Sequence, residues 1–293
     1  MKRALNYVII TPVRNEAEFL PLTIRSVVAQ TIRPTMWIIV NDGSRDKTGA
    51  LAEEAARTHS WIRVVHRSDR GFRQAGSGVM EAFYDGYKLV EKEPWEFLVK
   101  LDGDLSFEPN YFERCFQAFA ADPRLGIAGG TICSLRDGVP QEESKIDPTF
   151  HVRGATKIYR AECWRAIGGL IRAPGWDTVD EVKANMLGWR TRTLEGINAI
   201  HHRPTGAAYG SWNDMAKGGV ANYIAGYHPL FMFLKCIRRL ADKPYIIGGC
   251  ALWAGYTKAW LKRMPRVGDP ELIRYFQRQQ MNRLLGRDSL WRS

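Results

Sequence analysis

The chain has 293 residues, of which 45% are hydrophobic and 25% are charged, without a low-complexity tract, and this length and composition predict one main globular domain with an appendage. Lysine and arginine number 42 against 31 acids, and the net charge of +11 favours an anionic partner: nucleic acid, a membrane surface or a phosphate-bearing substrate. The five cysteines are widely spaced and include no C-x-x-C pair, which argues against a disulfide framework and a zinc site and favours a reducing, cytosolic setting.

From the N-terminus to residue 101, apolar runs of strand length alternate with amphipathic segments of helical period. The apolar run at residues 7–10 is too short for a signal peptide. The alternation predicts βαβ units and a parallel sheet, whose ligand site lies at the carboxyl ends of the strands. Polar clusters at residues 14–16, 41–44 and 102–104 should therefore converge on one edge. The expected strands cover residues 7–11, 36–40, 62–66 and 97–101, and the expected helices cover 18–30, 47–58 and 78–91.

The next part of the chain continues the α/β pattern to about residue 210. We expect helices at residues 110–121, 161–167 and 179–187, strands at 127–134 and 190–200, and a polar, mobile loop at 136–148. Two of these helices should end at Gly168 and Gly188, because glycine readily takes the left-handed conformation that ends a helix.

Residues 211–293 have a different character, with fewer acids and many aromatics, and we expect them to form a helical extension of the domain at residues 1–210. Two apolar segments, 223–237 and 244–261, are shorter than the roughly 20 uninterrupted apolar residues that a membrane-spanning helix needs. Basic residues punctuate both, as in helices that lie on an anionic leaflet. The alternative is a helical pair packed on the domain at residues 1–210 with a solvated basic face.

Two acids separated by one glycine, Asp102-Gly103-Asp104, directly follow a buried strand. Paired carboxylates at the mouth of a sheet can share a divalent ion, since Mg²⁺ and related cations prefer oxygen ligands, and Gly103 lets the backbone bend beneath it. Such an ion would leave coordination positions open for diphosphate oxygens. A simple acidic turn is the alternative for an isolated D-x-D.

Asp42 lies at the end of another strand, in the turn sequence VNDGS. Its carboxylate can accept a hydrogen bond from the N3–H of uracil or an N–H of guanine, and could thereby read a base. The alternative is a turn-forming aspartate that caps the next helix.

Taken together, four stretches resemble the nucleotide-sugar-binding half of family 2 glycosyltransferases, which have the GT-A fold. The resemblance covers about residues 6–207 and indicates a bacterial type with a membrane-associating helical extension. The matching stretches are IITPVRNE at 9–16, SVVAQT at 26–31, IIVNDGSRDKT at 38–48 and LDGD at 101–104.

The resemblance implies roles for these residues. The base of a nucleoside-diphosphate sugar would lie against Asp42 and the loop that contains Thr11, Pro12, Arg14 and Glu16. The Asp102-Gly103 pair would face the ribose, and Asp104 with Asp102 would hold Mg²⁺ or Mn²⁺ on the diphosphate. Asn41 stands where the family more often has aspartate.

The resemblance also places a catalytic base after the D-x-D, in GWDTVDE at residues 175–181. Asp177 matches the base position, with Trp176 in place of the usual glutamate. Val179 replaces the family's second aspartate, so Asp180 or Glu181 is the alternative for either role. Asp177, like Thr178, could instead cap the following helix. A carboxylate base would take the proton of an acceptor hydroxyl, and a single displacement would invert the anomeric centre.

Three further groups are candidates for donor contacts. Some GT-A enzymes use a downstream histidine as a metal ligand, and His201 or His202 could serve, but not both, because adjacent side chains on a strand point in opposite directions. A structural histidine is the alternative. Arg203 could reach a phosphate. In the loop that also carries Arg67 and Arg70, we favour Arg73 for contact with the diphosphate or base.

The leading interpretation is a metal-dependent, inverting glycosyltransferase that uses a UDP- or GDP-sugar and a lipid-linked or polysaccharide acceptor. It would lie peripherally on the cytoplasmic face of the cell membrane. The alternatives are a nucleotidyltransferase, which usually has a glycine-rich triphosphate loop that residues 11–16 lack, and a basic nucleic-acid-binding protein. No recognition helix or aromatic RNA-binding motif is recognisable, so we expect no nucleic-acid partner.

Overall fold

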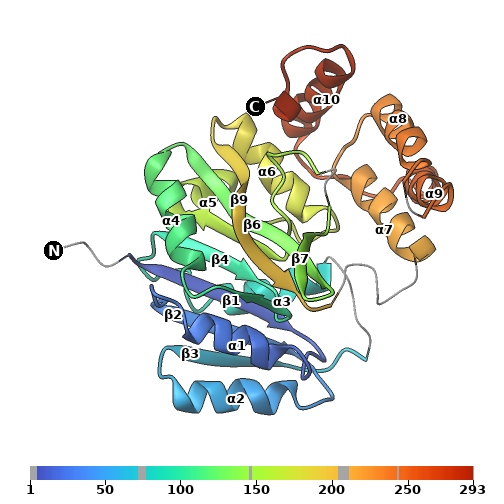
Figure 1. The fold of residues 1–293 in the computed structure, drawn as a ribbon. Coiled ribbons are helices and arrows are strands. Elements are labelled where there is room, and N and C mark those ends of the chain that lie inside the picture. The colour runs from blue at the N-terminus through green and yellow to red at the C-terminus, as the bar shows by residue number, and fades with distance from the viewer. Residues whose placement is uncertain (1–4, 72–76, 145–146, 204–210, 243, 293) are drawn as a thin grey trace.

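The computed structural model describes residues 5–71, 77–144, 147–203, 211–242 and 244–292. Within these ranges a nine-stranded sheet lies between helices on both faces, and further helices follow at the C-terminal end (Figure 1). The strands are β1 (Tyr7–Val13), β2 (Met36–Asp42), β3 (Ile62–Arg67), β4 (Phe97–Leu101), β5 (Leu105–Phe107), β6 (Leu125–Arg136), β7 (Val139–Glu142), β8 (Thr156–Arg160) and β9 (Arg190–His201). The helices are α1 (Leu20–Val28), α2 (Thr48–Thr58), α3 (Ser77–Tyr87), α4 (Tyr111–Ala121), α5 (Ala161–Ile167), α6 (Trp176–Met186), α7 (Ser211–Ile224), α8 (Pro229–Arg239), α9 (Ile247–Leu261) and α10 (Pro270–Leu284), followed by a short 3₁₀ helix.

The N-terminal half of the sheet is parallel, as expected. Its strands lie in the order β3-β2-β1-β4, so that the carboxyl ends of β2, β1 and β4 are adjacent. The order continues β8-β6-β9-β5 and becomes mixed, because β8 runs antiparallel to both β4 and β6, and β5 runs antiparallel to β9. The loops that carry the polar clusters therefore share one edge of the sheet.

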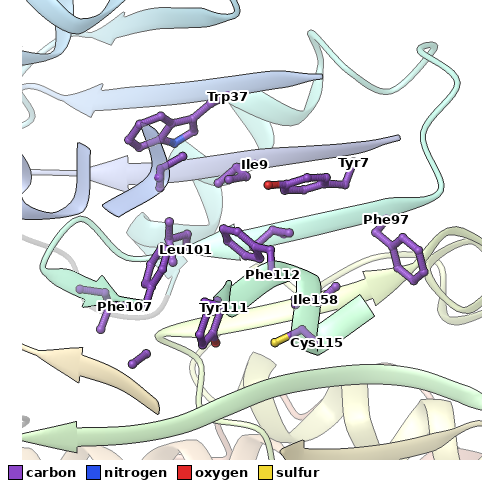
Figure 2. Packing of buried hydrophobic residues seen from close by; sticks show 14 of the residues in the cluster. Tyr7, Ile9, Trp37, Phe97, Leu101, Phe107, Tyr111, Phe112, Cys115 and Ile158 are labelled. Atoms are coloured by element: carbon purple, nitrogen blue, oxygen red, sulfur yellow. The ribbon is translucent and has the colours of Figure 1, made fainter. Parts of the chain in front are cut away.

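Two hydrophobic cores hold the layers together. One packs α1, α2 and α4 on one face of the sheet, where the ring of Tyr7 contacts that of Phe112 (Figure 2). The ring of Tyr7 also contacts that of Phe116. The other packs α3, α5 and α6 on the opposite face. Strands β1, β2 and β4 are buried on both faces, which explains why their sequences are continuous apolar runs.

Three sequence expectations need correction. Residues 136–148 do not form only a loop, because β7 folds back on β6 as a hairpin. The apolar segment 223–237 is not one helix: α7 ends at Ile224, and Pro229 begins α8. Helix α6 begins at Trp176, and its N-cap is Gly175 in the left-handed conformation, so neither Asp177 nor Thr178 is the capping residue.

The C-terminal helices pack against α6 through a third hydrophobic cluster, which includes Val179 and Val182. Glycines allow close approach of the backbones. A Cβ on Gly219 of α7 would lie 2.0 Å from the carbonyl oxygen of Leu252 in α9, and one on Gly175 would lie 2.9 Å from the carbonyl oxygen of Ala221 in α7. The extension is therefore in van der Waals contact with the start of α6.

The expected boundary at residue 210 falls immediately before α7. None of the helices in the described part of the chain combines the length and the apolar character that crossing a membrane requires.

Candidate active site

The acidic pair lies where β4 gives way to β5, on the edge predicted for a ligand. Asp102 is one-third exposed, and its Oδ1 accepts a hydrogen bond of 2.5 Å from the buried ammonium of Lys100. Burial raises the pKa of Asp102; Lys100 opposes this shift, and the neighbouring Asp104 adds to it. The ammonium group of Lys100 thus provides, from the protein itself, one of the positive charges that offset the two carboxylates.

Asp104 is buried, and only one of its oxygens has a partner. Its Oδ2 lies 3.4 Å from Nε2 of His201, whose Nδ1 lies 2.9 Å from Oε1 of Glu143. Oδ1 is inaccessible to solvent, and no described residue donates a hydrogen bond to it. A buried carboxylate oxygen without a donor fits a cation ligand, because leaving it unsatisfied is otherwise costly.

The two histidines diverge at the end of β9. His201 faces Asp104, whereas Nε2 of His202 lies 2.7 Å from Oγ of Ser106 and its ring stacks on Phe19. The geometry therefore favours His201 over His202 as a third ligand. Among the described residues, however, no three His, Cys, Asp or Glu side chains form a ready-made metal cluster.

The pairing of His201 predicts a pH dependence in the metal-free protein. Burial opposes protonation, but the hydrogen bonds to Asp104 and Glu143 outweigh it and raise the pKa of His201 to about 10. This stabilisation is fully present below the ordinary pKa of about 6.5 and is lost as the pH rises through about 10. Between about pH 7 and about pH 10, we expect the free energy of unfolding in EDTA to fall by roughly 2 kcal/mol more in the parent than in His201→Gln. Equal slopes in denaturant titrations of the two proteins would contradict the prediction.

The carboxylate of Asp42 is held by two arginines on the neighbouring strand and loop. Oδ1 accepts a 2.5 Å hydrogen bond from Arg67, and Oδ2 accepts one from Arg70. Arg14 reaches the carbonyl oxygen of Asp42 at 2.5 Å and also pairs with Asp69 at 2.6 Å. These hydrogen bonds and ion pairs join the loops after β1, β2 and β3 into one network of charged side chains. A base that contacts Asp42 would meet the arginines as well.

The other predicted donor residues lie along the same edge with different exposure. Thr11 is buried, and its hydroxyl accepts a hydrogen bond from the indole of Trp37. A nucleotide sugar could therefore contact only the backbone of Thr11. Pro12 is half-buried at the end of β1. The carboxylate of Glu16 pairs with both terminal nitrogens of Arg203, at 2.9 and 2.8 Å, which occupies the arginine that we considered for a phosphate.

Two predicted residues, Arg73 and Gly103, offer no side chain to the site in the described part of the structure. Arg73 lies outside the described residues. Gly103 has little room for a side chain, because a Cβ would lie 2.5 Å from Cγ1 of Val13. Packing of the turn against β1 thus accounts for this glycine.

The segment predicted to carry the base begins α6. Asp177 lies in its first turn and is half-buried, and no described residue donates a hydrogen bond to its carboxylate. A Cβ on Gly154 would lie 3.4 Å from Oδ2 of Asp177, and the carbonyl oxygen of Gly154 accepts a 2.5 Å hydrogen bond from Lys100. Asp102, Lys100, Gly154 and Asp177 are therefore contiguous, and the two predicted acidic centres meet at one place.

Asp180 and Glu181 face the interior instead. Nζ of Lys157 lies 3.0 Å from both oxygens of Asp180 and 2.6 Å from Oε1 of Glu181, and all three side chains are fully buried. Tyr159 donates to Asp180, and burial is the main cause that raises the pKa of Asp180 to about 6. This arrangement favours a structural role for Asp180 over the catalytic role that we considered.

Lys157 also connects this buried network to the base. It donates a 2.6 Å hydrogen bond to the carbonyl oxygen of Asp177. The ring of Trp176 lies within cation–π distance of two ammonium groups, with its centroid 5.2 Å from Nζ of Lys100 and 5.4 Å from Nζ of Lys157. The tryptophan that replaces the family's glutamate therefore lies beside both lysines.

Sequence reasoning missed Lys100, Lys157 and Glu143. The first two lie within buried strands, where a lysine must find a carboxylate or carbonyl partner, and this was a usable signal. Glu143 belongs to the segment that we expected to be a mobile loop.

A hollow of about 620 Å³ lies between the β6–β7 hairpin, the loop at residues 147–153 and β9. Its lining includes Glu142, His151 and Arg153, but not Asp102, Asp104 or Asp177. The acidic constellation therefore lies outside this hollow.

Comparison with known proteins gives a family match. Residues 8–172 match the family described as "Glycosyl transferase family 2". The matched range extends from β1 to α5 and therefore contains the acidic pair, but it does not contain Asp177, His201 or His202.

Two curated relatives match over part of their lengths. The chain is 32% identical over 130 residues to polyprenol monophosphomannose synthase of Mycolicibacterium smegmatis, covering 42% of this chain and 46% of that protein. It is 29% identical over 125 residues to undecaprenyl-phosphate mannosyltransferase of Micrococcus luteus, covering 41% and 49%. The matches thus span about half the length of these relatives.

Solved structures share the fold at low identity. The mannosyltransferase PcManGT of Pyrobaculum calidifontis, in complex with GDP-Man and Mn²⁺, matches with a TM-score of 0.56 and 19% identity over 97% of this chain and 76% of that one. S. aureus TarS 1-349 in complex with UDP-GlcNAc matches with a TM-score of 0.52 and 16% identity over 96% and 80%.

Proposed function

Because the chain belongs to glycosyl transferase family 2, we propose that it transfers a sugar from UDP or GDP to a lipid-linked or polysaccharide acceptor. The observation that carries the proposal is that Asp102, through Lys100, and Asp177 meet at Gly154, while Asp104 lies two residues after Asp102 with a buried oxygen that lacks a donor among the described residues. Membership of this family favours glycosyl transfer over the nucleotidyltransferase and nucleic-acid-binding alternatives.

The donor would lie across the ends of β2, β1 and β4. Asp42 and the backbone at Thr11 and Pro12 would contact the base, and Asp102 would contact the ribose. Arg67 and Arg70 would add donors beside Asp42, and these suit a base that offers both an N–H and a carbonyl oxygen, as uracil and guanine do. The related structures carry GDP-Man and UDP-GlcNAc, so both nucleotides remain in the proposal.

Asp104, with Asp102 and His201, would hold Mg²⁺ or Mn²⁺. Support comes from the unsatisfied buried oxygen of Asp104 and from the hard oxygen donors of the acidic pair. When bound, the ion would neutralise charge on the departing diphosphate. With few protein ligands, coordination positions would stay open for phosphate oxygens.

Asp177 would act as the general base for the acceptor hydroxyl. Its carboxylate has no donor among the described residues, so it is free to accept the proton of a nucleophile. Lys157 and the buried Asp180 and Glu181 would fix the start of α6 and thereby orient Asp177. Direct displacement by the deprotonated hydroxyl would invert the anomeric centre, and no enzyme nucleophile takes part.

The names of two relatives and the positive charge of the C-terminal helices support a lipid acceptor and a place at the membrane surface. One relative is named as a polyprenol monophosphomannose synthase and another as an undecaprenyl-phosphate mannosyltransferase, and both names contain a long apolar polyprenyl group. The basic C-terminal helices fit peripheral contact with the anionic inner face of the cell membrane, and the five free cysteines fit a reducing cytoplasm.

Thermal shift with UDP, GDP, CDP and ATP, each with and without Mn²⁺, tests the proposal. One diphosphate should raise Tm by several degrees only when Mn²⁺ is present, because a ligand at about 100 times its Kd stabilises the native state by about 2.7 kcal/mol. Stabilisation by none of the four, in a cooperatively unfolding protein, would contradict the proposal. Metal-dependent stabilisation by ATP alone would point to nucleotidyl transfer.

A further inference from the structure

Helix α8 has two apolar stripes, and only one of them is buried. Met232 and Cys236 are buried against the neighbouring helices. The second stripe, at Leu230, Phe233, Leu234, Ile237 and Leu240, is 36–48% exposed. Its spacing of three and four residues places these side chains on one side of the helix.

The turn into α9 extends this stripe. Tyr245, Ile246 and Ile247 are 59%, 65% and 47% exposed, and the amide of Ile246 donates to the carbonyl oxygen of Leu240, which holds the turn against the end of α8. We name the second stripe of α8 together with Tyr245–Ile247 the α8–α9 apolar face. A contiguous exposed apolar patch of this kind marks a docking surface.

The surroundings of this face are basic. Between Tyr227 and Gly268, the only acidic residue in the sequence is Asp242, and it pairs with Arg239 at 3.2 Å. Lys235 and Arg238, on α8 itself, are exposed. The basic residues in this stretch are Lys235, Arg238, Arg239, Lys243, Lys258, Lys262, Arg263 and Arg266.

We propose that the α8–α9 apolar face docks on an anionic phospholipid bilayer. Apolar side chains would enter the acyl boundary, and the flanking lysines and arginines would contact the headgroups. A second copy of the chain is a poorer occupant, because it would bring the same excess of positive charge to the interface. The inference rests on the proposed function for its setting, since a lipid-linked acceptor would be presented at such a bilayer.

The native cysteines offer a direct probe. Cys250 is exposed, whereas Cys115, Cys133, Cys163 and Cys236 are buried. It lies one turn after Ile247 in α9, next to the α8–α9 apolar face. An environment-sensitive fluorophore on Cys250 should shift its emission to the blue with vesicles of phosphatidylcholine and phosphatidylglycerol, and not with phosphatidylcholine alone. No shift with the anionic vesicles would overturn the proposal.

Vesicle flotation of the full chain tests the contributions of the apolar side chains and of the basic side chains separately. Phe233→Ser with Ile237→Ser should weaken binding to anionic vesicles at least about tenfold, and Lys235→Glu with Arg238→Glu about 30-fold or more. The matched controls are Leu135→Ser with Val139→Ser, which are 51% and 58% exposed on the β6–β7 hairpin, and Arg63→Glu with Lys92→Glu, which also reverse two exposed charges. Controls that bind as weakly as the test variants would overturn the assignment of the face.

Two readouts separate this proposal from its rivals. Sedimentation without lipid should give the same mass for the parent and for Phe233→Ser with Ile237→Ser; a parent dimer that the variant abolishes would assign the face to a second copy. Nucleotide-sugar hydrolysis without vesicles should be equal in all these proteins. Vesicle binding without any hydrolysis would refute the proposed function and leave the docking surface standing.

Discussion

Replacement of Asp104 with asparagine should lower the rate of sugar transfer by about 10³-fold or more, because the charge on the departing diphosphate would no longer be neutralised. The change keeps the shape of the side chain but removes the anionic oxygen that lies buried without a hydrogen-bond donor. The measurement is initial rate against Mn²⁺ concentration, together with the Mn²⁺-dependent change in Tm. Both should be lost together.

A surface aspartate provides the control for this change. Asp122 pairs with Arg190 at 3.0 Å and lies at the C-terminal end of α4, whereas β5 precedes the N-terminal end of that helix. Asp122→Asn should leave rate and Mn²⁺ response unchanged. If Asp104→Asn reaches the parent rate at saturating Mn²⁺, Asp104 is not the ligand that we propose.

Replacement of Asp177 with asparagine should lower kcat by about 10²- to 10⁴-fold while donor binding is retained, because the variant cannot take the proton of the acceptor hydroxyl. Binding of the nucleotide diphosphate should persist, since Asp177 does not contact Asp104 or the Asp42 network in the structure. The measurements are single-turnover transfer and thermal shift with the nucleotide. Weaker donor binding with an unchanged rate of transfer would contradict a role as base.

Asp180 is the informative partner variant, because it was the alternative base. Asp180→Asn removes one charge from the fully buried group around Lys157, and breaking such a pair costs about 3–5 kcal/mol of stability. We therefore expect a large fall in Tm for Asp180→Asn and a small one for Asp177→Asn. If Asp180→Asn remains stable but inactive, the roles must be exchanged.

The sequence was sufficient to predict the parallel half of the sheet and the edge at which its polar loops meet. Strands β1, β2 and β4 are continuous apolar runs because they are buried on both faces, and this leaves a strong local signal. The protein partners of Asp42 were not predicted. A turn aspartate shows nothing in its own sequence of the two arginines that lie 25 and 28 residues further along the chain.

The second half of the sheet was harder to predict for a physical reason. Strand β8 carries Lys157 at a fully buried position, where a lysine is stable only because Asp180 and Glu181 arrive from α6. Strand β5 has only three residues and pairs with β9, almost one hundred residues later. Both strands depend on long-range partners, which local periodicity does not reveal.

The glycine contact between Gly175 and α7 has a consequence for the choice of acceptor. A Cβ on Gly175 would lie 2.9 Å from the carbonyl oxygen of Ala221, and one on Gly219 of α7 would lie 2.0 Å from that of Leu252 in α9, so the start of α6 is in close backbone contact with the C-terminal helices. If those helices rest on a bilayer, Asp177 is held at a fixed height above the lipid. The enzyme would then select acceptors by length, because only an acceptor whose reacting hydroxyl projects to that height above the lipid would reach Asp177.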